Sequence, residues 1–408
     1  MKIAVIGGGA SGLLASLHAA WQDAPVILFE RNASLGRKLL VTGSGRCNLT
    51  NDRVSTNPFT CGDPHWLRSV LDQFGVQELR KTLHKIGIPT YKTWDGWYYP
   101  LSNSAHSVVN AITHAVNSAG IKIHTASQVV NITKENNIFR IFYLQNKNQY
   151  FIDVDKVIVS TGGKAYPTLG TKGEMFTVLK NLGHTINPIK PALAPVLAEL
   201  GGLRNLKGVR LDLGTALYQG SERLASASGN MIFTEWGLNG PAVMDLSHHV
   251  PDPPGDSLTI SLNLLHFIEN EFYVLLSEKR KTQFPVSLLL SAFFPPKVVH
   301  TYTNLAGIKE NQPLNKLDDR AIEHLIHYLK DTRLIVSGVR GFMYCQASTG
   351  GVPVNEVNPT NLESLIHKGL HLTGETLDVV GPCGGFNLHF AFASGSLAGQ
   401  AASNSDGV

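Results

Sequence analysis

The sequence predicts an α/β protein with a buried parallel sheet that is interrupted by two inserted segments. Three observations predict this class. A short apolar strand, a glycine-rich turn and a helix open the chain. The spacing of apolar residues changes after residue 190, first to that of short strands and later to that of helices. A second glycine-rich turn, followed by a helix of small residues, occurs near the C-terminal end.

The first 30 residues match a Rossmann-like nucleotide-binding unit. Residues 2–6 form an apolar run typical of a strand buried on both faces. The turn that follows has the pattern G-x-G-x-x-G and comprises Gly7, Gly9, Ala10, Ser11 and Gly12. These glycines allow a tight turn, close approach of a pyrophosphate and close packing of the helix expected at 13–21. A second strand at 26–29 ends on Glu30, whose carboxylate can bind a ribose hydroxyl.

Three later stretches are expected to lie along the same crevice: residues 31–51, the glycine pair at 162–163 and residues 375–387. Residues 31–51 combine glycines, asparagines and cations, and the alternative is a surface loop closed by its own Asn side chains. A third buried strand, at 154–159, leads into another glycine pair. The candidate binding residues are Arg31, Arg37, Lys38, Thr42, Gly43, Gly45, Arg46, Val129, Thr161, Gly162, Gly163, Gly374, Glu375, Asp378, Gly385, Phe386 and Asn387.

The distribution of these stretches favours FAD over a mobile nicotinamide. A nicotinamide enzyme needs one glycine turn, whereas a permanently held flavin needs contacts along its whole length. Glu375 or Asp378 can bind a ribityl hydroxyl. The amides at 385–387, at a helix start, can face the pyrimidine end of the ring system. Because no second G-x-G-x-x-G occurs, NAD(P)H, the expected electron donor, must bind in the same cleft.

The domains follow from the breaks in the pattern. We expect a discontinuous FAD-binding domain, of the glutathione-reductase type, at 1–190 and 345–408. A β-barrel-like insertion is expected at 191–262 and 333–344, where short strands alternate with glycine turns. A small helical insertion is expected at 263–332. Helical spacing of apolar residues also predicts a helix at 65–86.

Composition narrows the class of protein further. With 408 residues, 43% hydrophobic and 16% charged, the chain can bury a full core. No apolar run is long enough to cross a bilayer, so no membrane association is expected. The four cysteines are scattered without a C-x-x-C pair, which predicts reduced thiols, a cytoplasmic location and no metal site. The net charge of +4 permits a polyanionic partner without requiring one.

At three motifs the chain resembles the YhiN-type flavoproteins, the NAD(P)/FAD-dependent oxidoreductases of the BaiN/RdsA kind. The motifs are Gly36-Arg37-Lys38 with Gly43-x-Gly45-Arg46-Cys47-Asn48-x-Thr50-Asn51, Phe233-Thr234 with Gly237-Leu238-x-Gly240-Pro241-Ala242, and Gly374-Glu375-x-Leu377-Asp378-Val379 with Gly384-Gly385-Phe386-Asn387-Leu388. The resemblance implies FAD, a β-barrel and a helical insertion. It also implies either ribosomal RNA dihydrouridine synthesis or bile-acid reduction. The chain departs from the family pattern at Trp97, Glu235, Asn239, Val380 and Phe386.

Reduction of a conjugated C=C bond takes a hydride from the flavin and a proton from an acid. Cys47 is the first candidate acid, because the adjacent Arg46 would lower its pKa; the alternative is a small buried packing residue. Arg46 is the candidate for binding a developing enolate oxygen, or else forms a structural ion pair. Glu235 is a weaker candidate acid, and the ordinary alternative is a solvated carboxylate. The aromatic residues of 94–99 are a candidate stacking surface for a base or the flavin, and the ordinary alternative is the core of their own hairpin.

Three functions follow. The first is an FAD-dependent enzyme that uses NAD(P)H to reduce a uridine of ribosomal RNA. The second is an FAD-dependent reductase of a small enone-like metabolite. The third is a flavin-bearing RNA-binding protein without turnover. Cations at Arg204, Lys207, Arg210 and Arg223 are candidate phosphate contacts, or an ordinary barrel surface. The sequence leaves the oligomeric state open.

Overall fold

The computed structural model describes residues 1–255 and 257–404. The chain divides into two compact units. The first comprises Met1–Pro191 together with the segment from Gln346 onward, and the second comprises Ala192–Cys345. Because residues from both ends of the chain build the first unit, the second unit is an insertion in it.

A parallel sheet forms the centre of the first unit, in the order β20-β11-β1-β2-β7. Its strands are β1 (Ile3–Ile6), β2 (Val26–Phe29), β7 (Lys122–His124), β11 (Lys156–Val159) and β20 (Leu370–Leu372). Every residue of β1, β2, β11 and β20 is buried. This explains their uninterrupted apolar sequences, because both faces of a parallel sheet are covered.

The register aligns the carboxyl ends of these strands. Ile6 pairs with Phe29 on one side and with Val159 on the other, and Val159 pairs with Leu372. The next residues, Gly7, Glu30, Ser160 and Thr373, therefore emerge at one edge of the sheet. In open α/β sheets the ligand site lies at this edge.

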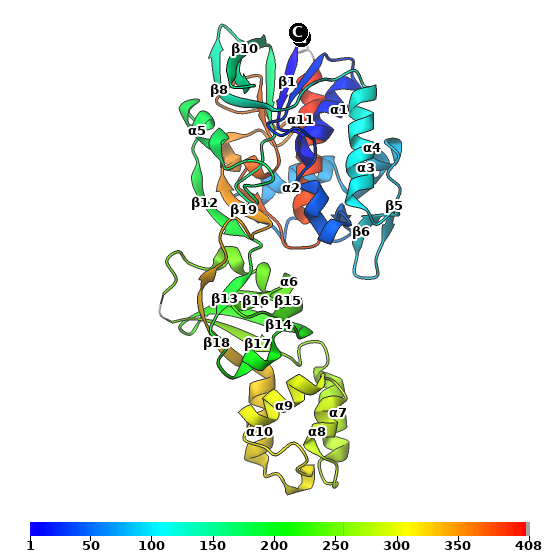
Figure 1. The fold of residues 1–408 in the computed structure, drawn as a ribbon, viewed down its shortest axis with the longest axis vertical. Helices are drawn as coiled ribbons and strands as arrows, with labels where there is room; N and C mark the ends of the chain where they lie inside the picture. The colour runs from blue at the N-terminus through cyan, green and yellow to red at the C-terminus, as the bar shows by residue number, and fades with distance from the viewer. Residues whose placement is uncertain (256, 405–408) are drawn as a thin grey trace. The chain divides into compact units, whose positions relative to one another are not determined.

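Two helices from opposite ends of the chain pack closely on the sheet (Figure 1). They are α1 (Ala10–Ala20) and α11 (Phe386–Ser403). A Cβ built on Gly395 would lie 2.1 Å from the carbonyl oxygen of Ser11, and one on Gly399 would lie 2.2 Å from that of Ala15. The small residues of α11 are thus needed for backbone contact with α1.

Other helices complete the first unit. They are α2 (Pro64–Gln73), α3 (Val76–Lys85), α4 (Ala105–Ser118) and α5 (Glu174–Asn181). The helical spacing expected at 65–86 is confirmed, but it belongs to two helices and not to one. Phe74 ends α2 with a non-helical backbone, and Gly75 caps the start of α3. Apolar spacing continues across the break because both helices bury residues against the same core.

Smaller sheets surround the parallel one. Antiparallel β8 (Ser127–Glu135), β9 (Ile138–Gln145) and β10 (Asn148–Val154) form one sheet, and β3 (Thr50–Asn51), β6 (Trp97–Pro100) and β5 (Thr90–Lys92) form another. Two-stranded pairs join β12 (Asn187–Ala192) to β19 (Ala347–Gly351) and β21 (Val379–Val380) to β4 (Thr60–Cys61). The pairing of β21 with β4 brings the last part of the chain beside an early loop.

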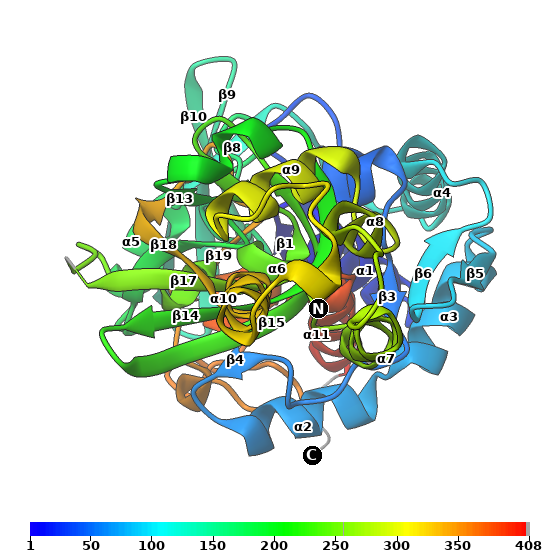
Figure 2. The same ribbon diagram turned by 90° about the horizontal axis from the view of Figure 1, so that it is seen from below.

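The second unit contains a closed barrel and a group of helices (Figures 1 and 2). The barrel order is β13 (Val196–Ala198), β16 (Gly237–Asn239), β15 (Glu222–Phe233), β14 (Arg210–Gln219), β17 (Leu258–Asn263) and β18 (Thr332–Val339). The short helix α6 (Pro241–Met244) packs on it. Between β17 and β18 lie α7 (Glu269–Lys279), α8 (Val286–Ser291), α9 (Pro296–Leu305) and α10 (Asp319–Lys330). No described helix is long and apolar enough to span a membrane.

Candidate functional site

The glycine turn after β1 leaves one open position and two closed ones. Gly7 has φ +107°, and a Cβ on it would lie 2.5 Å from the carbonyl oxygen of Ser160. A Cβ on Gly12 would lie 1.9 Å from the carbonyl oxygen of Gly7. A Cβ on Gly9 would meet no protein atom within 4 Å. The second glycine therefore faces open space at the start of α1, where helix amides can receive a phosphate.

Neighbouring backbone and side-chain N–H groups donate hydrogen bonds to the carboxylate of Glu30 and fix its position at the end of β2. One oxygen accepts from the amide of Gly8 at 2.8 Å, and the other accepts from the amide and side chain of Asn32, each at 2.7 Å. Glu30 is 8% exposed. Its carbonyl oxygen accepts from the amide of Ser127, which brings the strand carrying Val129 alongside. The carboxylate has lone-pair capacity left for ribose hydroxyls.

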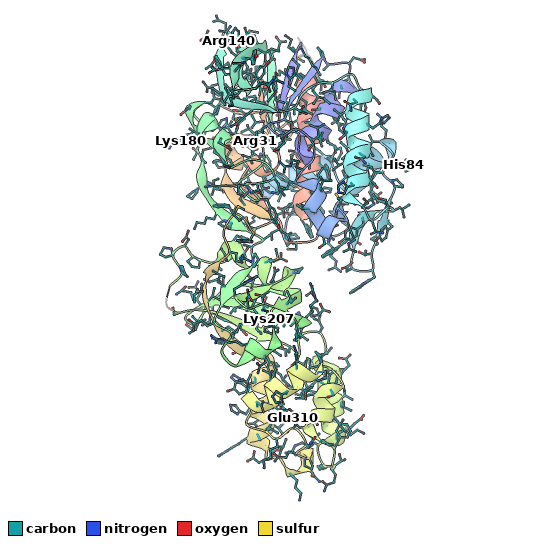
Figure 3. The ribbon with its side chains drawn as sticks, viewed as in Figure 1. Arg31, His84, Arg140, Lys180, Lys207 and Glu310 are labelled. Carbon is teal, nitrogen blue, oxygen red and sulfur yellow. The ribbon has the colours of Figure 1, made fainter. Side chains whose placement is uncertain are left out.

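The cations of residues 31–38 are engaged within the protein. Arg31 pairs with Glu174 at 2.8 Å (Arg31 is labelled in Figure 3). Arg37 donates to Asn32 at 2.8 Å. Lys38 pairs with Glu375 at 2.8 Å, a contact between residues 337 positions apart. The pairing of Lys38 with Glu375 therefore connects two of the stretches expected to bind the cofactor.

The two C-terminal carboxylates support strand β19. Glu375 accepts from the amide and hydroxyl of Ser348, at 2.6 and 2.8 Å. Asp378 accepts from the amide of Gly350 at 2.7 Å and from the side chain of Asn187 at 2.8 Å. Both carboxylates therefore accept hydrogen bonds from β19, and Asp378 also accepts one from its neighbour β12. Each carboxylate thus binds a backbone amide of β19, a contact that no local sequence pattern indicates.

The glycine pair after β11 lies beside this network. A Cβ on Gly163 would lie 2.0 Å from the hydroxyl oxygen of Ser348 and 2.6 Å from a carboxylate oxygen of Glu375. Gly162, with φ +73°, meets no protein atom within 4 Å. Thr161 precedes the pair and is partly exposed. The open glycine again leaves backbone accessible at the ligand-binding edge of the sheet.

The loop after Leu39 presents a cation on an aromatic ring. Thr42 donates to the carbonyl of Leu39 at 2.7 Å, and Gly43 and Gly45 have φ of +55° and +84°. The guanidinium of Arg46 lies 4.5 Å from the centre of the Tyr99 ring, and its Nη2 donates to the Tyr99 hydroxyl at 3.3 Å. No carboxylate in the described part of the chain pairs with Arg46, so its charge remains available to a ligand.

The expected lowering of the Cys47 pKa is wrong. Cys47 is fully buried, and burial raises the pKa of its thiol to about 11 against the opposing effect of a hydrogen bond with Thr42. The adjacent guanidinium of Arg46 stacks on Tyr99. Although Arg46 is adjacent to Cys47 in sequence, its guanidinium does not contact the sulfur, so burial has the largest effect on the thiol pKa. The alternative of a small buried packing residue describes Cys47 better.

Glu235 and the 94–99 hairpin follow their ordinary alternatives. Glu235 is exposed and pairs with Lys207 at 2.7 Å. In the 94–99 hairpin Tyr98 and Tyr99 are buried, whereas Trp94 is 97% exposed. The hairpin therefore has its own aromatic core.

The start of α11 is tied to the loop at 48–51 by polar groups. The Asn51 amide donates to the carbonyl of Gly384 at 3.0 Å, and the Thr50 hydroxyl lies 2.8 Å from Nδ1 of His389. Burial lowers the pKa of His389 to about 4, so its ring is neutral near pH 7. Asn48 is 6% exposed, and its Oδ1 has no hydrogen-bond partner in the described residues. A buried acceptor without a donor is costly, and a ligand N–H would satisfy it.

The other site residues at this end shape the loop. Asn387 accepts from the amide of Gly381 at 2.9 Å and donates to its carbonyl at 2.7 Å. Phe386 is buried, with its ring centre 5.7 Å from that of Phe59. Sequence reasoning missed His389, because a lone histidine within a small-residue helix carries no signal of the Thr50 contact.

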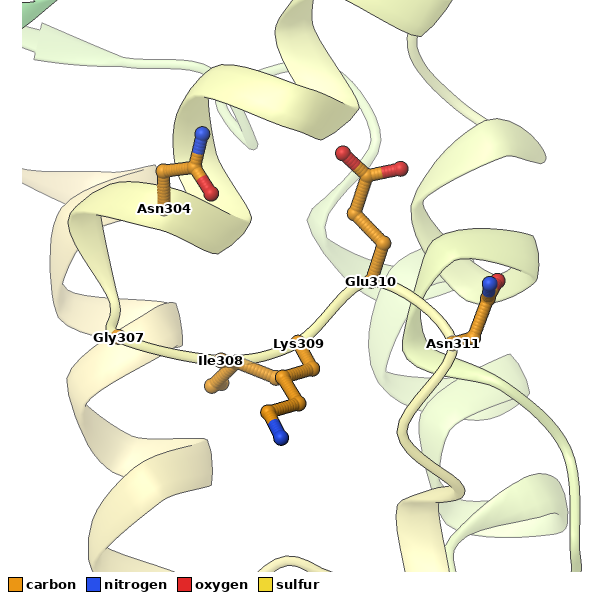
Figure 4. A pocket seen from close by; sticks show the side chains of 6 residues that line it. All are labelled: Asn304, Gly307, Ile308, Lys309, Glu310 and Asn311. Atoms are coloured by element: carbon orange, nitrogen blue, oxygen red, sulfur yellow. The ribbon is translucent and has the colours of Figure 1, made fainter.

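The residues present fit a dinucleotide flavin. An open helix start can take the pyrophosphate, a carboxylate at the end of β2 can take a ribose, and an unsatisfied amide oxygen lies beside the start of α11. All of these groups belong to the first unit. A separate hollow of about 670 Å³ lies in the second unit after α9, lined by Asn304 and residues 307–311 (Figure 4). None of the expected cofactor residues lines it.

Comparisons with known proteins agree with this description. The HI0933-like protein Rossmann domain family matches residues 1–401. A 3-dehydro-bile acid delta(4,6)-reductase from Clostridium scindens is 34% identical over 408 residues, covering 98% of each chain. The ribosomal RNA dihydrouridine synthase of Escherichia coli is 28% identical over 395 residues, covering 96% of this chain and 95% of that protein.

A solved structure shows the same fold at low identity. The 3-ketosteroid-delta4-(5alpha)-dehydrogenase from Rhodococcus jostii RHA1 superimposes with a TM-score of 0.54 at 14% identity, over 99% of this chain and 97% of that one. The family match spans nearly the whole sequence, and the relatives are aligned from end to end. The chain belongs to the HI0933-like family of flavin-dependent oxidoreductases.

Proposed function

We propose that this protein holds FAD in the first unit and uses NAD(P)H to reduce a carbon–carbon double bond conjugated to a carbonyl group. One observation carries the cofactor assignment. The register brings Gly7, Glu30 and Ser160 to one edge of the sheet, and Gly9 lies open beside them. Turn, acid and strand end are the parts that a dinucleotide needs.

Each part of the cofactor is assigned to residues of this chain. Gly9, Ala10 and the first turn of α1 would hold the pyrophosphate, and Glu30 the adenosine ribose. The loop at 43–48 and the start of α11 would hold the ring end, with Asn48 Oδ1 accepting a ring N–H. When bound, FAD supplies hydride transfer. The protein supplies orientation and charge.

Arg46 is the residue proposed to act on the substrate. Reduction of an enone or of uracil places negative charge on the carbonyl oxygen. A guanidinium without a carboxylate partner stabilises that oxygen by charge-assisted hydrogen bonds. Tyr99, whose ring lies 4.5 Å from the guanidinium, limits the directions in which Arg46 can point. Cys47 is not assigned the proton transfer, because its thiol is buried.

For the substrate we propose a uridine of ribosomal RNA. The support is the 28% and 25% identity to two ribosomal RNA dihydrouridine synthases, each over 395 residues. The test is to incubate unmodified ribosomal RNA with the purified flavoprotein and NAD(P)H, and to measure dihydrouridine by mass spectrometry. Formation of dihydrouridine is the expected result. Oxidation of NAD(P)H without dihydrouridine would contradict this substrate.

The second candidate is a small enone. The 34% identity to the bile-acid reductase favours it, because a delta(4,6)-reductase of a 3-oxo compound acts on double bonds conjugated to a carbonyl. A 3-oxo-4,6-diene bile acid is the probe, and loss of its ultraviolet absorption measures turnover. If NAD(P)H fails under anaerobic conditions to bleach the bound flavin, both reductase assignments fail and a flavin-bearing RNA-binding protein without turnover remains.

A further inference from the structure

We propose that the second unit carries a contact surface for single-stranded RNA, centred on Arg340, Trp236 and Tyr344. These three residues are called the Arg340 platform below. The proposal rests on the RNA substrate proposed above, and it adds a binding surface on the second unit, whereas the expected cofactor residues belong to the first unit. The partner chemistry is a phosphodiester chain with unstacked bases.

The platform is a cation held against two aromatic rings. The guanidinium carbon of Arg340 lies 3.3 Å from the ring centre of Tyr344 and 4.7 Å from that of Trp236. The backbone fixes this arrangement, because the amide of Arg340 donates to Pro195 and the amide of Tyr344 donates to Gly341, each at 2.9 Å. Two rings on one guanidinium direct its N–H groups outward in a defined plane.

Two other stacked arginines of the described chain are neutralised by carboxylates, whereas Arg340, like Arg46 and Arg80, has no carboxylate partner among the described residues. Arg333 lies over the ring of Tyr218 and pairs with Asp331 at 3.1 Å. Arg140 lies over Phe151 and pairs with Asp153. No carboxylate among the described residues forms an ion pair with Arg340, so its charge is available to an anion from outside.

The rings and their surroundings are accessible. Tyr344 is 50% exposed, its neighbour Met343 is 49% exposed, and Trp236 is partly exposed. Lys207 adjoins the turn that carries Trp236, since it pairs with Glu235 (Lys207 is labelled in Figure 3). Arg210, at the start of β14, is exposed and bonds only to the neutral side chain of Asn230, at 3.3 Å, among the described residues.

These features fit single-stranded RNA better than a protein. Exposed aromatic faces stack bases without regard to sequence, and unpaired guanidinium groups bind phosphates in the same strand. An apolar protein partner would gain little from an unneutralised cation at the centre of its contact, because burying that charge is costly. A small carboxylate would occupy Arg340 alone and would not need the rings.

The test measures RNA binding by the flavin-loaded protein with a fluorescein-labelled twelve-nucleotide oligouridylate, by anisotropy at several salt concentrations. Arg340→Ala is expected to weaken binding about tenfold and to reduce the salt dependence by about one phosphate contact. Arg340→Lys keeps the charge and should recover only part of the affinity. Arg333→Ala is the matched control, because it removes a stacked but neutralised arginine and should leave binding within about twofold.

The outcomes separate this surface from the proposed function. If Arg340→Ala binds as tightly as the wild type, or Arg333→Ala weakens binding equally, the surface is refuted, whether or not dihydrouridine still forms. If the wild type binds no oligouridylate while it reduces the bile-acid probe, the surface and the RNA substrate both fail and the second candidate stands. Flavin absorbance and the thermal midpoint of each variant exclude loss of folding as the cause.

Discussion

The glycine turn provides the sharpest prediction, because two of its positions differ only in what surrounds them. Gly9 has φ −87° and ψ −167°, a conformation that alanine adopts freely, and a Cβ there meets nothing within 4 Å. Gly9→Ala should therefore leave the apoprotein as stable as the wild type, or up to about 1 kcal/mol more stable through the unfolded chain. Gly12→Ala places a Cβ 1.9 Å from the Gly7 carbonyl and should cost about 3 kcal/mol or more.

Gly9→Ala, which should leave stability unchanged or slightly raised, should weaken FAD binding. A methyl group on Gly9 fills the space that a phosphate needs and removes one charge-assisted hydrogen bond, worth about 1.5–3 kcal/mol. This corresponds to about 10- to 150-fold weaker FAD binding. Urea denaturation of the apoprotein measures stability, and quenching of flavin fluorescence measures affinity. Wild-type FAD affinity in Gly9→Ala would refute the assignment of this turn to the pyrophosphate.

Three further predictions concern single side chains. Cys47→Ala should change kcat by less than about twofold, because the thiol is buried and its pKa is about 11. For the same reason iodoacetamide should not label Cys47 in the native protein between pH 6 and 9. Rapid labelling would contradict this. Arg46→Ala should lower kcat/KM by about 10²–10³ with full flavin content, and Arg46→Lys should recover part of it; unchanged steady-state kinetics would remove Arg46 from the mechanism. The pKa of His389 is about 4 in the folded protein and about 6.5 in the unfolded chain. Between these values unfolding takes up a proton, so the stability that the neutral ring contributes is complete above pH 6.5 and is lost as the pH falls towards 4. In denaturation curves across this window, His389→Gln should reduce the pH slope by about 1.4 kcal/mol per pH unit, and a slope equal to that of the wild type would show that His389 does not titrate as proposed.

Several parts of the fold could be predicted from local sequence. Uninterrupted apolar runs specify strands that are buried on both faces, and the parallel sheet contains them in β1, β2 and β11. The roles expected of Gly7 and Gly12 are confirmed, since each lacks room for a Cβ. The boundary at residues 74–75 was missed, because apolar spacing persists when two consecutive helices pack on one core.

The site depended more strongly on contacts that no local pattern specifies. The charge of Arg46 would have acted on Cys47 only if the side chain turned towards the sulfur. Instead the guanidinium stacks on Tyr99, 53 residues further along the chain. The pairing of Lys38 with Glu375, and the contact of Thr50 with His389, likewise join segments more than 330 residues apart.

The sequence by itself predicted a dinucleotide cofactor, because a glycine turn, a helix start and an acid at the end of a strand are set by neighbouring residues and their backbone conformations. Only the tertiary structure decided which groups are available for chemistry. Burial raises the pKa of the Cys47 thiol, ion pairs occupy Arg31 and Lys38, and Arg46 and Arg340 are left without described carboxylate partners. The physical reason is that solvation and charge pairing depend on which distant side chains surround a group, and these are chosen by the fold.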